Sequence, residues 1–147
     1  MEGLLNARDV GKFVSKINVL LSGFPYQLFS KADEHTFHGF LLSMLSGMGL
    51  RVAAETSSSL GRLDLLVLLD STTYVMELKL DKSPTEGLQQ IKEKKYYVPY
   101  LNQGKALALV GISFSSTARN IGSWVGELLD EHGGVIRALT PEDRSFC

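Results

Sequence analysis

Apolar residues in the first third of the chain recur at helical spacing. Over residues 10–21 they fall at every third or fourth position, which predicts an amphipathic helix that the Gly-Phe-Pro at residues 23–25 ends. A second helix is predicted over about residues 31–48, capped by Ser30 and closed by two glycines. Glu34 and His38 fall on the N-terminal extension of its apolar stripe.

The middle of the chain has the pattern of buried strands. Two apolar runs occupy residues 61–69 and 74–80. Three charges interrupt them: Asp64 in the first run, and Glu77 and Lys79 in the second. An unpaired ion in an apolar interior is costly, so charges in such strands need a reason to be there. We therefore look for the function at this cluster.

The three charges come together if the two runs form a hairpin. A two-residue turn at residues 70–71 would put Asp64 directly opposite Glu77. Glu77 and Lys79 then share a face, and Leu78 points the other way. Opposed carboxylates repel, so a shared proton or a divalent cation must compensate. This register is a hypothesis: a one-residue slip would turn Asp64 to the other face, and a two-residue slip would put it opposite Lys79.

Helical and strand patterns alternate along the rest of the chain. Ser-Pro-Thr-Glu at residues 83–86 predicts a helix start, with serine as N-cap and proline at N1, and the helix should run to about residue 98. Strands are predicted over residues 50–56 and 105–114. Residues 119–129 fit a helix by apolar spacing, but two glycines argue against a stable one, so a strand is predicted there. The tail from Thr140 is expected to fray.

These elements predict one α/β domain. Three consecutive strands followed by a helical crossover imply a central mixed β-sheet flanked by helices, with the core order α-β-β-β-α-β. We expect a single domain over residues 1–147, with its core at about residues 12–128 and a tail at residues 130–147.

Composition limits the classes of function. The chain has 147 residues and a formal net charge of −1, so no overall basic field advertises a nucleic-acid partner, although a local basic patch stays compatible with it. The lone cysteine, Cys147, excludes an internal disulfide framework. No apolar run reaches the length of a membrane span and the N-terminus lacks a secretory pattern, so we expect a cytoplasmic protein with no membrane partner.

Two acids and a lysine on adjacent strands suit metal-assisted hydrolysis of a phosphodiester. Carboxylates hold Mg²⁺ or Mn²⁺, which acidifies a bound water and stabilises charge in the transition state. A lysine can orient or deprotonate the attacking water, or neutralise the developing charge.

The same residues resemble the PD-(D/E)XK nuclease superfamily. Asp64, a twelve-residue gap and then Glu77-Leu78-Lys79 match its D…(D/E)xK signature. The likeness covers about residues 12–125 through Glu34-His35-Thr36-Phe37-His38, Glu55-Thr56 with Gly61-Arg62-Leu63-Asp64, Gln90-Ile91 with Tyr96, and Val110-Gly111-Ile112-Ser113-Phe114. Together these look like the nuclease-like domain often found C-terminal to an AAA-ATPase-like domain in bacterial and archaeal proteins.

The resemblance implies a restriction-endonuclease-like fold and a role for each site residue. It implies Asp64 and Glu77 as ligands of Mg²⁺ or Mn²⁺, and Lys79 as the catalytic lysine. It implies Glu34 as an acid supplied by the first core helix, and Gln90 as a contact to metal-bound water or phosphate. The candidate nucleic-acid-binding side chains are Arg62, Tyr96, Lys94 and Lys95.

The favoured interpretation is a metal-dependent nuclease acting on DNA, and other interpretations stay open. The three charges could form a structural ion pair between strands, and Glu34 could serve the first turn of its helix. The lysines in residues 92–95 could be a solvated face. The alternatives are a catalytically inactive nucleic-acid- or protein-binding module and a non-nuclease hydrolase with the same metal site. An AAA-ATPase-like partner and a homodimer are both compatible with the sequence, which contains no ATPase domain.

Overall fold

The computed structural model describes residues 2–23, 34–57 and 62–141, without the side chains of residues 2, 34–38, 54–57 and 62–64. The helices are α1 (Glu2–Asn6), α2 (Val10–Ser22), α3 (Glu34–Gly47), α4 (Pro84–Lys94) and the short 3₁₀ helix η2 (Val98–Tyr100). The strands are β1 (Arg51–Ser57), β2 (Arg62–Leu68), β3 (Thr72–Leu80), β4 (Ala106–Ser115), β5 (Asn120–Leu129) and β6 (Val135–Leu139).

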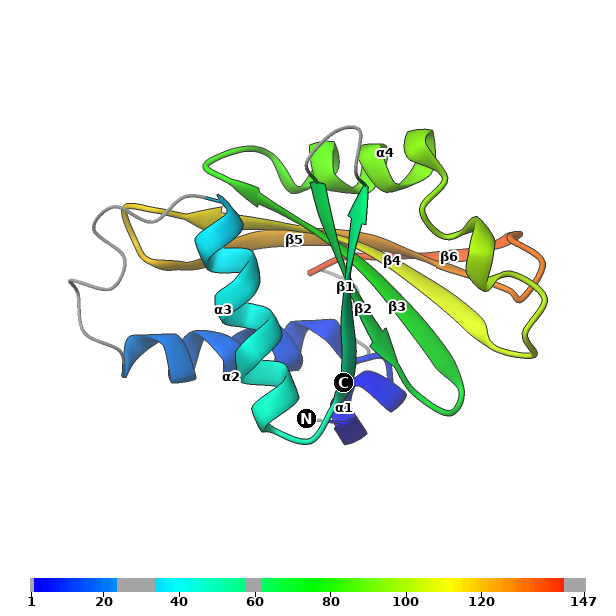
Figure 1. The fold of residues 1–147 in the computed structure, drawn as a ribbon, viewed down its shortest axis with the longest axis horizontal. Helices are drawn as coiled ribbons and strands as arrows, with labels where there is room; N and C mark the ends of the chain where they lie inside the picture. The colour runs from blue at the N-terminus through cyan, green and yellow to red at the C-terminus, as the bar shows by residue number, and fades with distance from the viewer. Residues whose placement is uncertain (1, 24–33, 58–61, 142–147) are drawn as a thin grey trace.

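The described strands form one mixed sheet in which the spatial order follows the sequence, β1-β2-β3-β4-β5-β6. β3 and β4 run parallel, and α4 makes the crossover that parallel neighbours require. The other four neighbouring pairs are antiparallel. The run α3-β1-β2-β3-α4-β4 reproduces the predicted core order (Figure 1). The predicted α/β architecture, a mixed sheet flanked by helices, is therefore confirmed.

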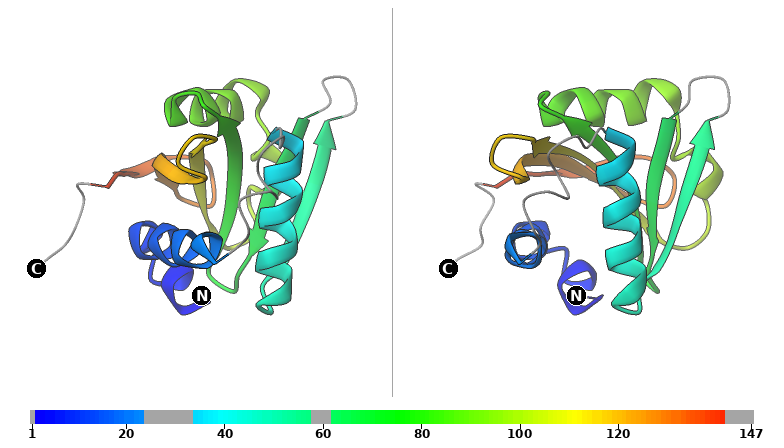
Figure 2. Two further views of the ribbon diagram at one scale, coloured as in Figure 1. Left: turned by 90° about the vertical axis from the view of Figure 1, so that its left-hand side faces the viewer. Right: turned by 60° about the vertical axis from the view of Figure 1, so that its left-hand side comes forward.

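Helices cover both faces of this sheet. α4 lies on one face against β3 and β4, whereas α2 and α3 lie on the other, against β5 and β1 (Figures 1 and 2). Side chains alternate along β3, so Met76 and Leu78 enter the core beneath α2 and α3, and Val75 enters the core beneath α4. The α4-side core consists of Leu66, Val75, Leu88, Ile91, Leu107, Leu109 and Leu129. We call the larger cluster on the opposite face, which includes Phe13, Ile17, Leu45, Tyr74 and Ile112, the α2/α3-side core.

The β2–β3 hairpin has the predicted register. The amide of Leu69 donates to the carbonyl of Thr72 over 3.0 Å across a two-residue turn. The antiparallel ladder then pairs Leu65 with Met76. The next positions along the two strands are Asp64 and Glu77, and the ladder ends before them.

Several predicted elements are confirmed to within about two residues. They are the helix at residues 10–21, the described part of the helix at residues 31–48, and the strands at residues 50–56, 105–114 and 119–129. The glycines of β5 fit a strand because one of them has no room for a side chain: a Cβ on Gly126 would lie 2.5 Å from the carbonyl oxygen of Leu109. No helix in the described ranges is long and apolar enough to cross a bilayer.

One predicted boundary was wrong, and two elements, β6 and α1, were not predicted. α4 ends at Lys94 instead of about residue 98, because Lys95 adopts a left-handed conformation (φ 57°) and its amide caps the carbonyl of Ile91. The predicted tail at residues 130–147 contains β6, an edge strand with mostly exposed side chains and therefore a weak apolar pattern. The five-residue α1 is too short to show a helical period.

Candidate active site

Strand β3 carries two charged side chains into the interior on the side of α4. Glu77 is 3% exposed and Lys79 is 5% exposed. Because side chains alternate along a strand, both share the face of Val75, which packs in the α4-side core. Leu78 between them packs in the α2/α3-side core. One short stretch of strand thus presents an acid and a lysine together and closes the opposite core.

The two strands of the hairpin separate at the level of these charges. The pairing of β2 with β3 ends at Leu65 and Met76. β2 begins three residues earlier, at Arg62, and β3 continues to Leu80. In Figure 1 the beginning of β2 and the end of β3 point in different directions. Glu77 therefore lies where the sheet forks, one position beyond the last β2–β3 pair.

The helix over this face begins at the Lys79 end of β3. Ser83 caps α4, because its hydroxyl oxygen accepts from the amide of Thr85 over 3.2 Å, and Pro84 takes the first helical position. These are the predicted N-cap and N1 residues, so that prediction is confirmed. From there α4 runs back across β3 and β4.

Two glycines let α4 touch the main chain of the site. Gly111 on β4 is the partner of Glu77 in the parallel ladder. A Cβ on Gly111 would overlap the carbonyl oxygen of Pro84, and a Cβ on Gly87 would lie 3.0 Å from the carbonyl oxygen of Glu77. Sequence reasoning gave these glycines no role. A glycine inside an apolar strand is nevertheless the signal of a close backbone approach.

Gln90 lies about one turn after Gly87 on α4. Its side-chain nitrogen Nε2 is buried and donates to no described group. Leaving a buried donor unsatisfied costs about 1–3 kcal/mol. The amide is therefore available to an oxygen acceptor, such as a phosphate or a water, that the described protein groups do not supply.

Beyond Lys79, the chain is tied to the turn between β4 and β5. The Asp81 carboxylate accepts from the hydroxyl of Ser116 and, over 2.9 Å, from its amide. Both hydrogen bonds lower the pKa of the Asp81 carboxyl below its ordinary value, and the bond from the hydroxyl has the larger effect. Ser113, which is opposite Lys79 in the ladder, donates from its hydroxyl to the carbonyl of Lys82. The loop from which α4 starts is thus held by the end of β4 and by the turn that follows it.

The comparisons with known proteins agree with this arrangement. A family model described as the PD-(D/E)XK nuclease superfamily matches residues 32–124, more than half of the chain. The chain belongs to the PD-(D/E)XK nuclease superfamily. The matched range takes in α3, the strands β1 to β4, and α4, and so includes Glu77, Lys79 and Gln90.

A longer bacterial protein is similar to this superfamily member. It is described as an uncharacterized protein in the vnfD 5' region of Azotobacter chroococcum mcd 1. The two are 28% identical over 132 residues, which take in 86% of this chain and 26% of the relative. The chain therefore spans about a quarter of the length of that relative. No solved structure matches the chain.

Three of the site residues expected for this superfamily have undescribed side chains. Asp64 lies in β2, where its backbone pairs with that of Glu55 on β1. Arg62 is the first residue of β2, and Glu34 is the first residue of α3. The structure gives their places in the chain, and their side chains lie outside the described part.

The predicted nucleic-acid-binding residues that are described lie away from Glu77. Lys94 and Lys95 are exposed at the C-terminal end of α4, and Tyr96 packs at the edge of the α4-side core. Lys94 is seven residues beyond Gly87, the helix residue over Glu77, which corresponds to about 10 Å along the helix axis. These lysines therefore flank the site instead of entering it.

A divalent metal is the cofactor that PD-(D/E)XK nucleases generally use. Among the described side chains, no three His, Cys, Asp or Glu residues gather into a ligand set. Glu77 is the described carboxylate at the fork, and an anionic oxygen donor held in the interior fits a hard divalent cation. The donor chemistry at β3 is therefore compatible with the superfamily's metal.

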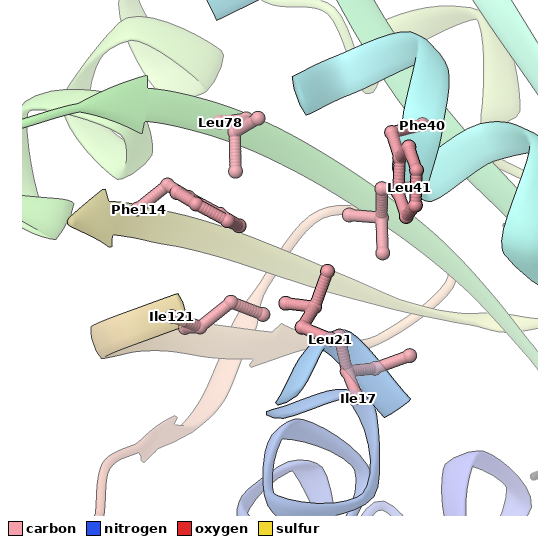
Figure 3. Close-up of a pocket in the computed structure, with 7 residues that line it drawn as sticks. All are labelled: Ile17, Leu21, Phe40, Leu41, Leu78, Phe114 and Ile121. Carbon is pink, nitrogen blue, oxygen red and sulfur yellow. The ribbon is translucent and has the colours of Figure 1, made fainter. Parts of the chain in front are cut away.

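The pocket drawn in Figure 3 lies on the other side of the sheet. It is lined by Ile17 and Leu21 of α2, Phe40 and Leu41 of α3, and Leu78, Phe114 and Ile121 of the sheet. All seven side chains are apolar, and they point toward one another from three sides. With no polar group to orient a reacting substrate, this pocket is a gap in the α2/α3-side core and separate from the charged site.

Proposed function

We propose that this chain is a metal-dependent nuclease that hydrolyses phosphodiester bonds, with DNA as substrate and Mg²⁺ or Mn²⁺ as cofactor. The observation that carries the proposal is the burial of Glu77 and Lys79 together on one face of β3, at the fork with β2. Because the chain belongs to a nuclease superfamily, we interpret this acid and this lysine as groups that take part in phosphodiester hydrolysis.

Asp64 is proposed as the second metal ligand. Continuing the β2–β3 register by one position from Leu65 and Met76 would put Asp64 across from Glu77. Leu66, two residues further along β2, packs in the α4-side core, so alternation supports the same face for Asp64. Glu34 is proposed as a further acid from the start of α3.

Each residue of the proposed site has its own task. Glu77 and Asp64 would hold the cation, which supplies Lewis-acid stabilisation of the phosphate and an acidified water. Lys79 would orient that water or take its proton, and its charge would stabilise the anionic transition state. Gln90 would donate its free amide hydrogens to a phosphate oxygen or to the water.

The burial of the charges favours an active enzyme over a silent module with the same fold. Taking a carboxylate and an ammonium out of water costs several kcal/mol per ion even after relaxation. Apolar residues of similar volume at 77 and 79 would pack in β3 without that cost. A domain that only binds a partner would gain nothing from keeping Glu77 and Lys79 here.

The chain as a whole is proposed to be one nuclease domain that works beside other domains or partners. Its relative is nearly four times as long as the matched region, which supports a working context larger than this domain. An AAA-ATPase-like partner is proposed for that context. Lys94, Lys95, Tyr96 and Arg62 are proposed to contact nucleic acid on either side of the site.

The direct test is cleavage by the purified chain. Supercoiled plasmid, linear duplex, single-stranded circular DNA and an RNA of matched length are incubated with Mn²⁺ or Mg²⁺. We expect cleavage of DNA, and a loss of roughly 10²–10³-fold in rate for Lys79→Met, which keeps side-chain volume but removes the charge. Lys82→Met, at an exposed lysine three residues later, is the matched control and should cleave normally.

Two results would overturn this proposal. One is wild-type cleavage that persists undiminished in EDTA, since it would need no metal. The other is equal cleavage by the Lys79→Met and Lys82→Met variants, which would show that the buried lysine has no part in the reaction.

A further inference from the structure

We infer that Gly87 and Gly111 are positioning residues for the catalytic strand: without side chains, they seat α4 on the main chain of β3 and thereby set Gln90 against Glu77. The inference rests on the proposed function, which assigns Glu77 to the metal site. It adds two residues that touch neither substrate nor metal and act through Glu77 and Gln90.

Gly111 fixes the distance between α4 and the sheet. It stands opposite Glu77 in the β3–β4 ladder, beneath the first turn of α4. An added Cβ would overlap the carbonyl oxygen of Pro84 and lie 2.6 Å from the amide nitrogen of Leu88. These two groups are the acceptor and donor that helix geometry pairs at the start of α4. Any side chain at 111 would therefore push this turn away from the strand.

Gly87 fixes the helix over Glu77 itself. An added Cβ would lie 3.0 Å from the carbonyl oxygen of Glu77, 3.5 Å from its Cβ and 3.2 Å from the Cα of Gly111. The helix backbone thus lies on the backbone of the catalytic residue with no side chain between them. A glycine in a helix interior costs about 0.5–1 kcal/mol relative to alanine, so its presence here calls for such a contact.

A second contact joins the C-terminal part of α4 to β5. The Nζ of Lys92 lies 3.1 Å from Oε1 and 3.2 Å from Oε2 of Glu127 on β5. Gln90 lies between this ion pair and the glycine contact at Gly87. With both ends of this span held, the position of Gln90 over the sheet follows from the seating of α4.

The consequence for catalysis is geometric. Reactions at a metal and a phosphate depend on the placement of each group to about 0.5 Å. A methyl group at 87 or 111 would lift α4, move the amide of Gln90 away from the fork, and release the packing that holds Glu77. Turnover should fall more than binding, because the groups at Glu77 and Gln90 need closer placement than the exposed side chains of Lys94 and Lys95, which can adjust to a shifted helix.

The test compares three glycine-to-alanine variants. Gly87→Ala and Gly111→Ala disturb the seating of α4. Gly126→Ala is the matched control, because its Cβ would also clash with a backbone carbonyl, that of Leu109, but its ladder partner Val110 packs in the α2/α3-side core. Each variant is measured for urea stability, for kcat and KM of DNA cleavage, and by hydrogen exchange with mass spectrometry.

We expect all three variants to be less stable than wild type. Below their unfolding transitions, kcat should fall at least about tenfold in Gly87→Ala and Gly111→Ala, with KM changed less than about threefold, and it should be near normal in Gly126→Ala. Amides of residues 77–80 and 85–91 should exchange faster in the first two variants only. If Gly111→Ala does not fold, Gly87→Ala, whose added Cβ makes milder contacts, is compared with Gly126→Ala alone.

Two outcomes separate this inference from the proposed function. An active wild type whose Gly87→Ala variant keeps the kcat and exchange pattern of Gly126→Ala overturns the positioning role and leaves the nuclease proposal standing. A wild type that neither cleaves nucleic acid nor binds Mn²⁺ overturns both, whatever the exchange data show about packing.

Discussion

The hydroxyl of Tyr74 donates to the main-chain carbonyl of Leu5 over 2.7 Å, and both residues are fully buried. The bond joins α1, which the sequence pattern did not reveal, to the strand that carries Glu77 and Lys79. The N-terminal helix is therefore attached to the middle of the sheet by a specific polar contact as well as by apolar packing.

Removing this hydroxyl should weaken the fold. Tyr74→Phe removes one of two donors to the carbonyl of Leu5, which also accepts from the amide of Arg8 over 3.0 Å, and the loss of one such hydrogen bond costs about 0.5–1.5 kcal/mol. Urea unfolding followed by circular dichroism measures the change. Tyr97→Phe, at a partly exposed tyrosine on the α4 side, is the control and should differ little from wild type. Equal stability of the Tyr74→Phe and Tyr97→Phe variants would contradict the importance of the bond to α1.

The same tyrosine predicts loss of stability in alkali. Burial raises the pKa of Tyr74 to about 12 from its ordinary value of 10.0, against the opposing effect of nearby Arg8 and Arg137. The neutral phenol is thus favoured in the folded chain. Its contribution, about 2–3 kcal/mol by linkage, is complete below pH 10 and is lost as the pH rises toward 12. Tyr74→Phe should flatten this part of the stability profile, and an unchanged slope would show that other groups cause it.

Acid should act on the loop at the end of β3. The pKa of the Asp81 carboxyl is lowered by its hydrogen bonds to Ser116, so its stabilising contribution is present above its ordinary value of 3.8 and is lost as the pH falls through the lower folded value. Asp81→Asn keeps a residue that tolerates the left-handed backbone at this position (φ 55°). We expect the variant to be less stable than wild type at neutral pH, with a difference that narrows in acid. A difference independent of pH would exclude the carboxylate as its cause.

Substitutions at two neighbouring residues of β3 should distinguish a loss of folding stability from a loss of catalysis. Leu78→Ala removes a buried side chain from the α2/α3-side core and should destabilise by about 2–5 kcal/mol, while the folded fraction keeps its activity. Glu77→Gln removes an anionic ligand, so its folded fraction should lose metal-dependent cleavage. Unfolding curves and cleavage rates of the two variants, taken below their transitions, decide the point. Comparable activity losses in both would mean that the alternation of roles along β3 is wrong.

Metal affinity provides a test that needs no substrate. Calorimetry should show that Mn²⁺ binds to wild type. The affinity should be at least about tenfold lower in Asp64→Asn and in Glu77→Gln, because each change removes an anionic ligand. Asp70→Asn, at the exposed turn of the same hairpin, is the matched control and should bind like wild type. Wild-type affinity in the Asp64→Asn variant would remove Asp64 from the proposed site.

Much of the fold could be predicted because it follows from local pattern. The hairpin register between Leu65 and Met76 came from counting back across a two-residue turn, and the start of α4 came from Ser83 and Pro84 at an N-cap and N1. The end of α4 could not be predicted in the same way. Lys95 is not a residue type that marks a left-handed cap, and the tyrosines that follow gain more by packing on the sheet than by continuing the helix.

The candidate site was only partly accessible to sequence reasoning. The charges at Glu77 and Lys79 stand out because they interrupt an apolar run. The role of Gly111 depends on which helix lies above it, and that contact joins residues more than twenty positions apart. A glycine in a strand indicates that something comes close, but the identity of the neighbour follows from topology and not from the pattern.

The strands lie side by side in the order in which they are synthesised, and this has a consequence for how the protein can change over evolutionary time. Apart from Glu34, the residues proposed for the nuclease site lie in a single uninterrupted stretch, residues 62–115. The segments on either side of this stretch can therefore be lengthened or fused to other domains without threading new chain through it. A unit of this kind can be moved between proteins as a whole, and a matched region that makes up about a quarter of a longer relative agrees with that expectation.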